Sequence, residues 1–334
     1  MVELTNNELV FRFPHVHESA VCKIKFMRTL RIPDDNKAYP LPAGLGLFPM
    51  AHVEDHAKKL PASWTQKGGV LLPMYQTEAM WISFESNSGY PFAVKIAAGK
   101  INAVTGQAWS EELEAKPQDY VVLPEQSWLD GFCVQKGLIR QFVAMPLGGG
   151  YTAEEQLSQS TENGGLQIVV YPMKRELYLE SLQESFDHVN YSIPSFCRNQ
   201  ATSTKSMGLA AGGLMRQEIS ADNYYGFKSW DMGVSKRCFV HILNSTQWAT
   251  ATGLPNLQKP LTITDYEKQG LPWFEKYDET SEALDGAMLL AGLDSVAAKA
   301  VKLGHEPLQD NESIKPKKII SLSGMLKSVK DGLW

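Results

Sequence analysis

Short apolar runs recur through the first half of the chain, and most end at proline or glycine. Residues 21–28 alternate roughly between apolar and basic side chains, which is typical of a half-buried strand. Few of these runs are separated by the roughly 10–15-residue helices that parallel strands need. The pattern therefore predicts antiparallel strands. Five further runs lie at 70–72, 79–84, 120–123, 138–145 and 166–171.

Residues 91–104 predict a β-hairpin. The apolar run from Phe92 rises to a turn at Ala98 and Gly99, and the chain returns through residues 100–104. Residues 50–60 predict a short helix instead. Its apolar residues recur at helical spacing, and Pro61 ends it.

The second half is mixed. Helices are predicted over 174–189 and 294–303, the second with Asp294 as its N-cap and Gly304 beyond its end. Residues 264–267, Thr-Asp-Tyr-Glu, have the pattern of a capping box. Residues 238–243 predict either a buried strand or a short helix, which periodicity alone does not separate.

These elements predict an α+β fold that is mainly β. We expect an antiparallel β-sandwich or barrel-like structure in the N-terminal half and peripheral helices in the C-terminal half. The predicted organisation is a β-rich domain over 1–180, a mixed region over 181–304 packed on it, and a linker with a short amphipathic tail over 305–334.

Composition and charge exclude two classes of protein. Among 334 residues, 43% are hydrophobic and 10% are aromatic, which is too apolar a composition for a wholly disordered chain. The formal net charge is −5, and no stripe of Lys and Arg precedes the last twenty residues, so we expect no nucleic-acid partner.

The cysteines and the apolar stretches indicate a compartment. Cys22, Cys133, Cys197 and Cys238 are too widely spaced for a finger or redox motif, and they are typical of reduced thiols in a cytoplasmic protein. The acidic, polar start lacks the pattern of a signal peptide. No apolar stretch reaches the roughly 18 residues of a membrane helix, so we expect no membrane insertion.

Six strings of the chain are distinctive, and they lie between about Met27 and Asn311. They resemble landmarks of an uncharacterised family of microbial proteins. The resemblance implies no activity, cofactor or fold, and it implies that the chain is a complete member of that family. The strings are RIPDD at 31–35, YPLP at 39–42, LPMYQTEAMW at 72–81, PFAVKIAAGKINAVTG at 91–106, YVVLPEQSWLDGF at 120–132 and GGLQIVVYPMK at 164–174.

Two sets of side chains suggest chemistry. His52 and His56 are four residues apart, which on one helix face would present two imidazoles to a divalent metal. Glu125 and Asp130 flank Trp128, as the paired carboxylates and sugar platform of a glycosidase would. Both sets also have ordinary structural explanations, as solvated helix residues and as turn residues.

A glycine-rich loop before a helix start can hold a phosphate through backbone N–H groups, and residues 148–156 have this form. Thr152 and Glu155 form a capping box there that would occupy those donors, so we favour a capped helix. Two thiol–imidazole pairs, Cys133 with His241 and Cys197 with His188, lack any local signature.

Two segments predict binding surfaces. The aromatic residues of 222–233 would bind a partner if exposed and would form a small core if buried, which we favour. The end of the chain forms an apolar face at helical spacing that must dock or stay disordered. We favour docking on its own chain, and docking on a second copy would make the protein self-assemble. The first set is Tyr224, Tyr225, Phe227 and Trp230, and the second is Leu326, Val329, Leu333 and Trp334.

The sequence does not specify one function. We favour a non-catalytic cytoplasmic protein that binds a partner or self-assembles, with a possible homo-oligomer formed through the C-terminal tail and no cofactor. The alternatives are a glycosidase-like hydrolase using Glu125 and Asp130, and a metal-binding protein using His52 and His56.

Overall fold

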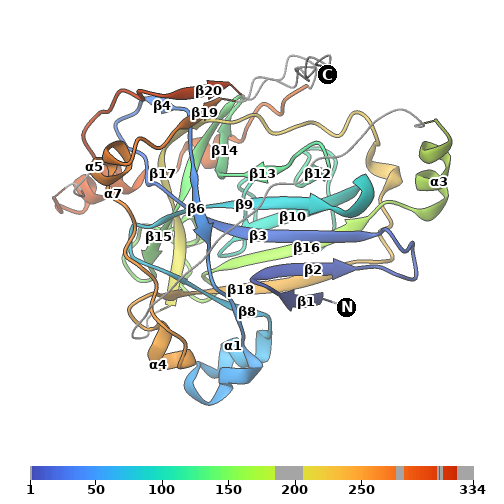
Figure 1. Ribbon diagram of the computed structural model, residues 1–334, viewed down its shortest axis with the longest axis horizontal. Helices are drawn as coiled ribbons and strands as arrows, with labels where there is room; N and C mark the ends of the chain where they lie inside the picture. Colours follow the sequence, from blue (N-terminus) through green and yellow to red (C-terminus); the bar gives the residue numbers. More distant parts are fainter. Residues whose placement is uncertain (1, 185–205, 276–281, 307, 309–310, 322–334) are drawn as a thin grey trace, which may run out of the picture.

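The computed structural model describes residues 2–184, 206–275, 282–306, 308 and 311–321. Its main sheet contains a continuous path of antiparallel neighbours, and Figure 1 shows several of these strands stacked side by side. In spatial order the path is β1 (Val2–Thr5), β2 (Glu8–Arg12), β3 (Val21–Thr29), β9 (Ala79–Ser86), β15 (Leu138–Pro146), β17 (Ser206–Arg216), β18 (Lys236–Asn244), β16 (Leu166–Pro172), β10 (Phe92–Ala98) and β12 (Val121–Leu123).

Shorter strands extend the main sheet, and three strands form a second, small sheet. The extensions are β4 (Ala38–Tyr39), β6 (Gly44–Leu47), β7 (Ala51–His52), β8 (Val70–Met74), β11 (Ile101–Asn102), β13 (Trp128–Leu129) and β14 (Gly131–Gln135). The small sheet consists of β5 (Leu41–Pro42), β19 (Trp273–Glu275) and β20 (Ile319–Ser321).

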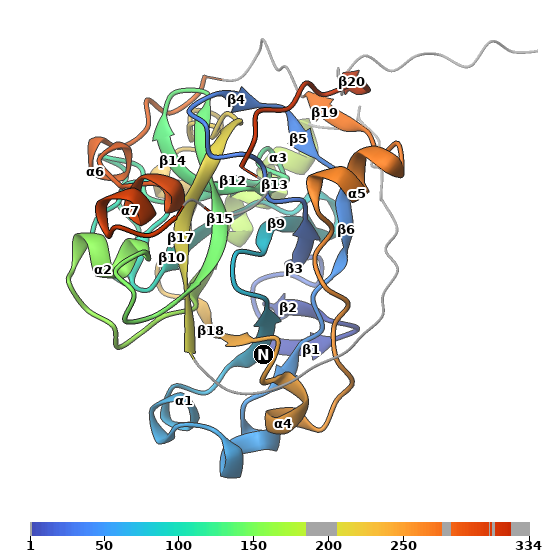
Figure 2. The same cartoon turned by 90° about the vertical axis from the view of Figure 1, so that its left-hand side faces the viewer.

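The helices are short and lie around the sheets. Helices α2 and α7 pack on β17, and α6 packs on β14, so all three lie on one side in Figure 2. Helices α1 and α4 lie at the end opposite the small sheet in both views. The α-helices are α1 (Ala62–Lys67), α2 (Ala153–Leu157), α3 (Arg175–Glu184), α4 (Trp248–Thr252), α5 (Ile263–Lys268), α6 (Met288–Ala291) and α7 (Val296–Lys302), and the 3-10 helices are η1 (Glu54–Lys59), η2 (Asn87–Gly89) and η3 (Phe227–Ser229).

This architecture confirms the α+β, mainly β class and its antiparallel strands. The predicted hairpin at 91–104 is present as β10 and β11. The boundary at residue 180 needs correction, because β17 and β18 hydrogen-bond to β15 and β16 within one sheet. Strands on both sides of that boundary share one hydrophobic core. The pattern suggests a boundary there because the predicted elements change from mainly strands to a mixture of helices and strands.

The core is deepest at β10, β16 and β12, whose residues are all buried. Strands covered on both faces have nearly continuous apolar sequences instead of alternating ones. Lys95 is the charged exception in β10, with 1% of its side chain exposed and an ion pair to Asp119. Its Nζ also donates to Ser110 Oγ at 2.8 Å and to the Glu112 carbonyl at 2.5 Å, so it holds this loop on the sheet.

Three predicted elements have different bounds or form. Residues 50–60 form β7 and η1 in place of one helix, because Ala51 and His52 pair with β8. The capping box predicted at 264–267 lies two residues earlier, at Thr262 and Asp265, which buries Ile263 and Tyr266. Residues 238–243 belong to a strand, β18. Among the described residues, no helix is long and apolar enough to cross a membrane.

Candidate functional site

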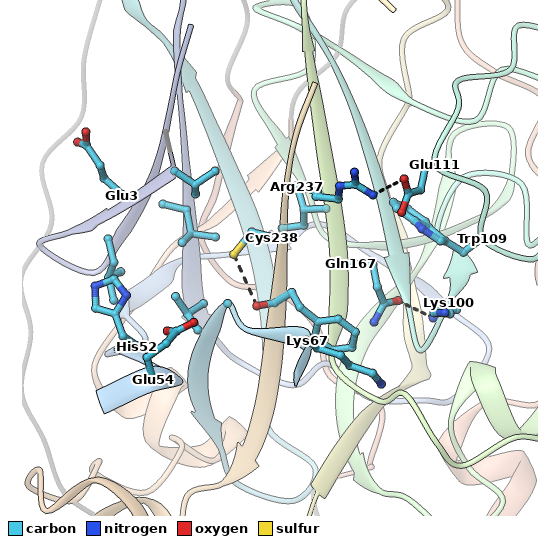
Figure 3. Close-up of a pocket in the computed structure, with 17 residues that line it drawn as sticks. Glu3, His52, Glu54, Lys67, Lys100, Trp109, Glu111, Gln167, Arg237 and Cys238 are labelled. Carbon is cyan, nitrogen blue, oxygen red and sulfur yellow. Dashed lines mark hydrogen bonds and ion pairs between the residues drawn. The ribbon is translucent and has the colours of Figure 1, made fainter. Parts of the chain in front are cut away.

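A pocket of about 450 Å³ opens between strand β1 and the first half of β18 (Figure 3). Strand β18 pairs with β16 from Lys236 onward, but its pairing with β8 begins only at Val240. Its first residues therefore line the pocket on the side where β8 has not yet begun. The lining residues are Val2, Glu3, Leu4, Leu9, His52, Glu54, Lys67, Gly69, Val70, Lys100, Trp109, Glu111, Gln167, Ile168, Arg237, Cys238 and Phe239.

Carboxylates lie on one side of the pocket. In Figure 3, Glu3, His52 and Glu54 lie on the same side of Cys238. Glu3 accepts a hydrogen bond from Arg12 Nε at 3.0 Å, which partly neutralises it. Glu54 is exposed at the start of η1, and it has no ion pair with another described residue.

Two ammonium groups lie on the opposite side. Lys67 is the last residue of α1, and its Nζ lies 4.9 Å from the centroid of the Phe239 ring. Lys100 lies in the turn between β10 and β11, where its backbone N–H donates to Gln167 Oε1 at 2.5 Å. Burial lowers the pKa of Lys67, and the positive charge of Lys100 lowers it further. The negative charges of Glu154 and Glu162 act in the opposite direction, so the repulsion between the two ammonium groups is partly offset.

Apolar rings complete this side. The Trp109 backbone N–H donates to the Lys100 carbonyl at 2.9 Å, which fixes the loop that carries the half-buried indole. Arg237 forms an ion pair with Glu111 at the rim, so its charge is already matched. The pocket thus has an aromatic wall beside two ammonium groups. Lys67 Nζ also donates to the Glu162 carbonyl at 3.4 Å and to Asn163 Oδ1 at 3.3 Å.

A stack of rings holds Phe239 in place. The His241 ring stacks on Phe239 at 4.3 Å and on Trp64 at 4.6 Å between centroids. Burial lowers the pKa of His241 to about 4, so the ring is neutral at pH 7. Its Nε2 lies 3.0 Å from the Gly68 carbonyl and therefore donates the single ring proton to it.

Gly69 brings the end of α1 against β18. Its φ is +90°, and a Cβ at this position would lie 2.1 Å from the Phe239 carbonyl oxygen. Only glycine permits this approach. The close contact places Lys67 beside the Phe239 ring and the pocket.

Cys238 lies in the middle of the pocket as a half-buried free thiol. Burial raises its pKa to about 12, and the negative charge of Glu54 adds to this effect. A thiol with this pKa remains protonated at pH 7 and is a poor nucleophile. Cys238 therefore contributes apolar surface to the pocket.

The structure separates the two predicted carboxylates. Glu125 is exposed and accepts a hydrogen bond from the Tyr225 hydroxyl at 2.8 Å. Asp130 is buried, with 3% of the residue exposed, and its backbone N–H donates to Gln217 Oε1. Neither residue lines the pocket between β1 and β18. This arrangement does not favour the paired-carboxylate hypothesis, because Glu125 is exposed whereas Asp130 is buried.

The two histidines of the metal hypothesis lie on different elements. His52 ends strand β7 and His56 lies in η1, so they do not share one helix face as the sequence predicted. No group of three or more His, Cys, Asp or Glu side chains within the described ranges could hold a metal ion. His52 instead lines the pocket beside Glu54.

The aromatic residues of 222–233 are mostly covered. Trp230 is 1% exposed, and its Nε1 donates to Asp222 Oδ2 at 2.8 Å. Tyr225 and Phe227 are half-buried, whereas Tyr224 is 76% exposed. The segment is thus a small core with one projecting ring. The tail residues Leu326, Val329, Leu333 and Trp334, and the pair Cys197 and His188, lie outside the described residues.

The glycine-rich loop is a capped helix start. Thr152 and Glu155 form a reciprocal capping box. Glu155 Oε1 also accepts hydrogen bonds from the backbone N–H groups of Gly148 and Gly150 at 2.7 and 2.9 Å. These donors are therefore not available to a phosphate. Cys133 is a buried thiol whose pKa burial raises to about 11.

Comparisons with protein-family models, with curated proteins and with solved structures give no match. The resemblance to a family of microbial proteins stays a prediction.

Proposed function

We propose that this chain is a non-catalytic binding protein whose pocket takes a small zwitterion with an apolar body. The supporting observation is the separation of charge across the pocket, with Glu54 on one side and Lys67 and Lys100 on the other. A ligand carboxylate would lie at the two ammonium groups, and a ligand ammonium would lie at Glu54. Trp109 and Phe239 would contact the apolar body between them.

The rim charges are exposed, so each contributes little until a ligand covers it. Exposed ion pairs are worth about 0–1 kcal/mol, and hydrogen bonds to charged groups that are partly buried by the ligand about 1.5–3 kcal/mol. Both ends of a zwitterion should therefore be needed for measurable affinity. The protonated Cys238 thiol favours recognition over nucleophilic chemistry at this pocket.

Isothermal titration with three probes tests this proposal. L-phenylalanine has both charges, N-acetyl-L-phenylalanine has only the carboxylate, and L-phenylalaninamide has only the ammonium group. We expect phenylalanine to bind about tenfold more tightly than either analogue, because each analogue loses one charged contact. Equal binding of all three probes, or binding of none, would overturn the proposal.

Removing a charge at one end of the pocket should weaken the binding of one analogue more than that of the other. Lys100→Asn removes an ammonium group at a position with φ of +62°, which asparagine tolerates. This variant should weaken the binding of N-acetyl-phenylalanine more than that of phenylalaninamide. Glu54→Gln should weaken the binding of phenylalaninamide more than that of N-acetyl-phenylalanine. The matched controls are Lys136→Asn and Asp55→Asn, two exposed positions that do not line the pocket. Loss of binding in the controls would contradict this assignment.

A second proposal is self-assembly through the C-terminal residues 326–334. The supporting observation is apolar exposure on α6 and α7, where Met288 is 92% exposed and Val301 is 65% exposed. Such side chains offer a second copy an apolar face. Deleting residues 322–334 leaves β20 and its pairing with β19 in place. We expect the deletion to convert oligomers to monomers in sedimentation velocity, and an unchanged profile would refute this proposal.

We also propose a reducing, cytoplasmic location. Cys22, Cys133 and Cys238 are free thiols, and two of them are buried. Reduced, buried cysteines are typical of cytosolic proteins.

A further inference from the structure

Strand β1 presents unpaired backbone groups along one edge. It forms a hairpin with β2 through a two-residue turn, Asn6 and Asn7, which have φ of 51° and 61° as a type I′ turn requires. In such a hairpin the residues that flank the turn, Thr5 and Glu8, exchange both hydrogen bonds, and every second pair does the same. The N–H and C=O groups of Val2 and Leu4 therefore point away from β2.

This edge borders the pocket. Val2 and Leu4 line the pocket from one face of β1, and Glu3 lines it from the other face. Because residues of both faces line it, the pocket follows the edge of the strand. Among the described residues, β1 pairs with β2 alone. Edge strands usually have a proline, a β-bulge or an inward-pointing charge that prevents pairing with another strand. Strand β1 contains neither a proline nor a bulge.

We infer that the ligand of this pocket is a short extended peptide that adds a strand to the edge of β1. This inference rests on the proposed function and names its ligand class. Strand addition gives affinity through main-chain hydrogen bonds, and pockets beside the strand select the side chains. The peptide runs along β1 with its ammonium group toward Glu54, and its central side chain extends across the pocket toward Trp109 and Phe239.

The probe is the tripeptide Ala-Phe-Ala with free ends, compared with two versions that are N-methylated at Phe or at the third residue. Successive N–H groups of a strand point in opposite directions, so only one of the two amides faces β1. We expect Ala-Phe-Ala to bind about tenfold more tightly than phenylalanine in isothermal titration. Methylation of the amide that faces β1 should abolish this gain in affinity. Methylation of the other amide should leave most of it.

Two variants of Leu4 test the protein side of the contact. Leu4→Pro removes the outward N–H without breaking the ladder to β2, and Leu4→Ala keeps the N–H and removes the side chain. We expect the proline variant to bind Ala-Phe-Ala about fivefold more weakly than the alanine variant. The two variants should bind phenylalanine equally. Matching circular dichroism spectra and melting temperatures of the two variants establish that β1 is intact in both.

The outcomes separate this inference from the proposed function. If the tripeptide binds no better than phenylalanine, or if both N-methylations have equal effects, strand addition is refuted and the zwitterion pocket stands. If neither phenylalanine nor the tripeptide binds, both are refuted.

Discussion

Replacing Asp130 with asparagine should raise the free energy of unfolding at pH 8 by about 2–4 kcal/mol. Burial raises the pKa of Asp130 from 3.8 to about 7, and a hydrogen bond from Trp128 offsets only part of this effect. Asp130 Oδ2 is buried and has no hydrogen-bond partner among the described residues. The folded protein at pH 8 therefore holds an ionised carboxylate in an apolar site, which asparagine would avoid.

The pH dependence has a definite sign. Between about pH 4 and pH 7, Asp130 is protonated in the folded chain and ionised in the unfolded chain. The folded state binds more protons, so its stability falls as pH rises through this window and levels off above it. Urea unfolding at pH 5 and pH 8 should show this loss in the wild type and a smaller one in Asp130→Asn. A variant with the wild-type slope would contradict this explanation, and Asp55→Asn serves as an exposed control.

Replacing Lys95 with methionine should lower the free energy of unfolding by about 3–5 kcal/mol. The side chains of Lys95 and Asp119 are 1% and 4% exposed, and the substitution leaves the Asp119 carboxylate buried without its partner. It also removes the hydrogen bonds to Ser110 and Glu112 that hold the 103–120 loop. Denaturant titration at pH 7 measures the loss.

The double variant Lys95→Met/Asp119→Asn is the control for that change. An asparagine at 119 retains an oxygen to accept the hydrogen bond from the Glu114 backbone N–H and has no charge. We expect it to recover more than half of the stability lost in the single variant, because buried ion pairs are often replaceable as a pair. A double variant as unstable as the single one would show that the loop bonds of Lys95 dominate.

Local pattern was sufficient to predict much of the fold. The hairpin at 91–104 and the capping box at Thr152 were predicted because each depends on residues close in sequence. The prediction of a single helix over 50–60 was wrong, because its first residues pair with β8, which lies about twenty residues further along the chain. Long-range pairing overrides the local apolar spacing at that point.

The candidate site could not be predicted in the same way. Glu54, Lys67, Lys100 and Phe239 come from four separate segments. The pairing of β10 with β16 and of β16 with β18 brings Lys100 and Phe239 together. No short sequence motif indicates that these strands pair. Local pattern favours Glu125 and Asp130 instead, which are five residues apart but differ completely in exposure.

A crystal structure of the protein soaked with phenylalanine would show whether the pocket binds a zwitterion. We expect density in the pocket between β1 and β18, with the ligand carboxylate at Lys67 and Lys100 and the ammonium group at Glu54. The ring should lie against Trp109 or Phe239. A pocket without bound ligand at saturating phenylalanine, or a ligand bound with its charges reversed, would contradict the proposed function.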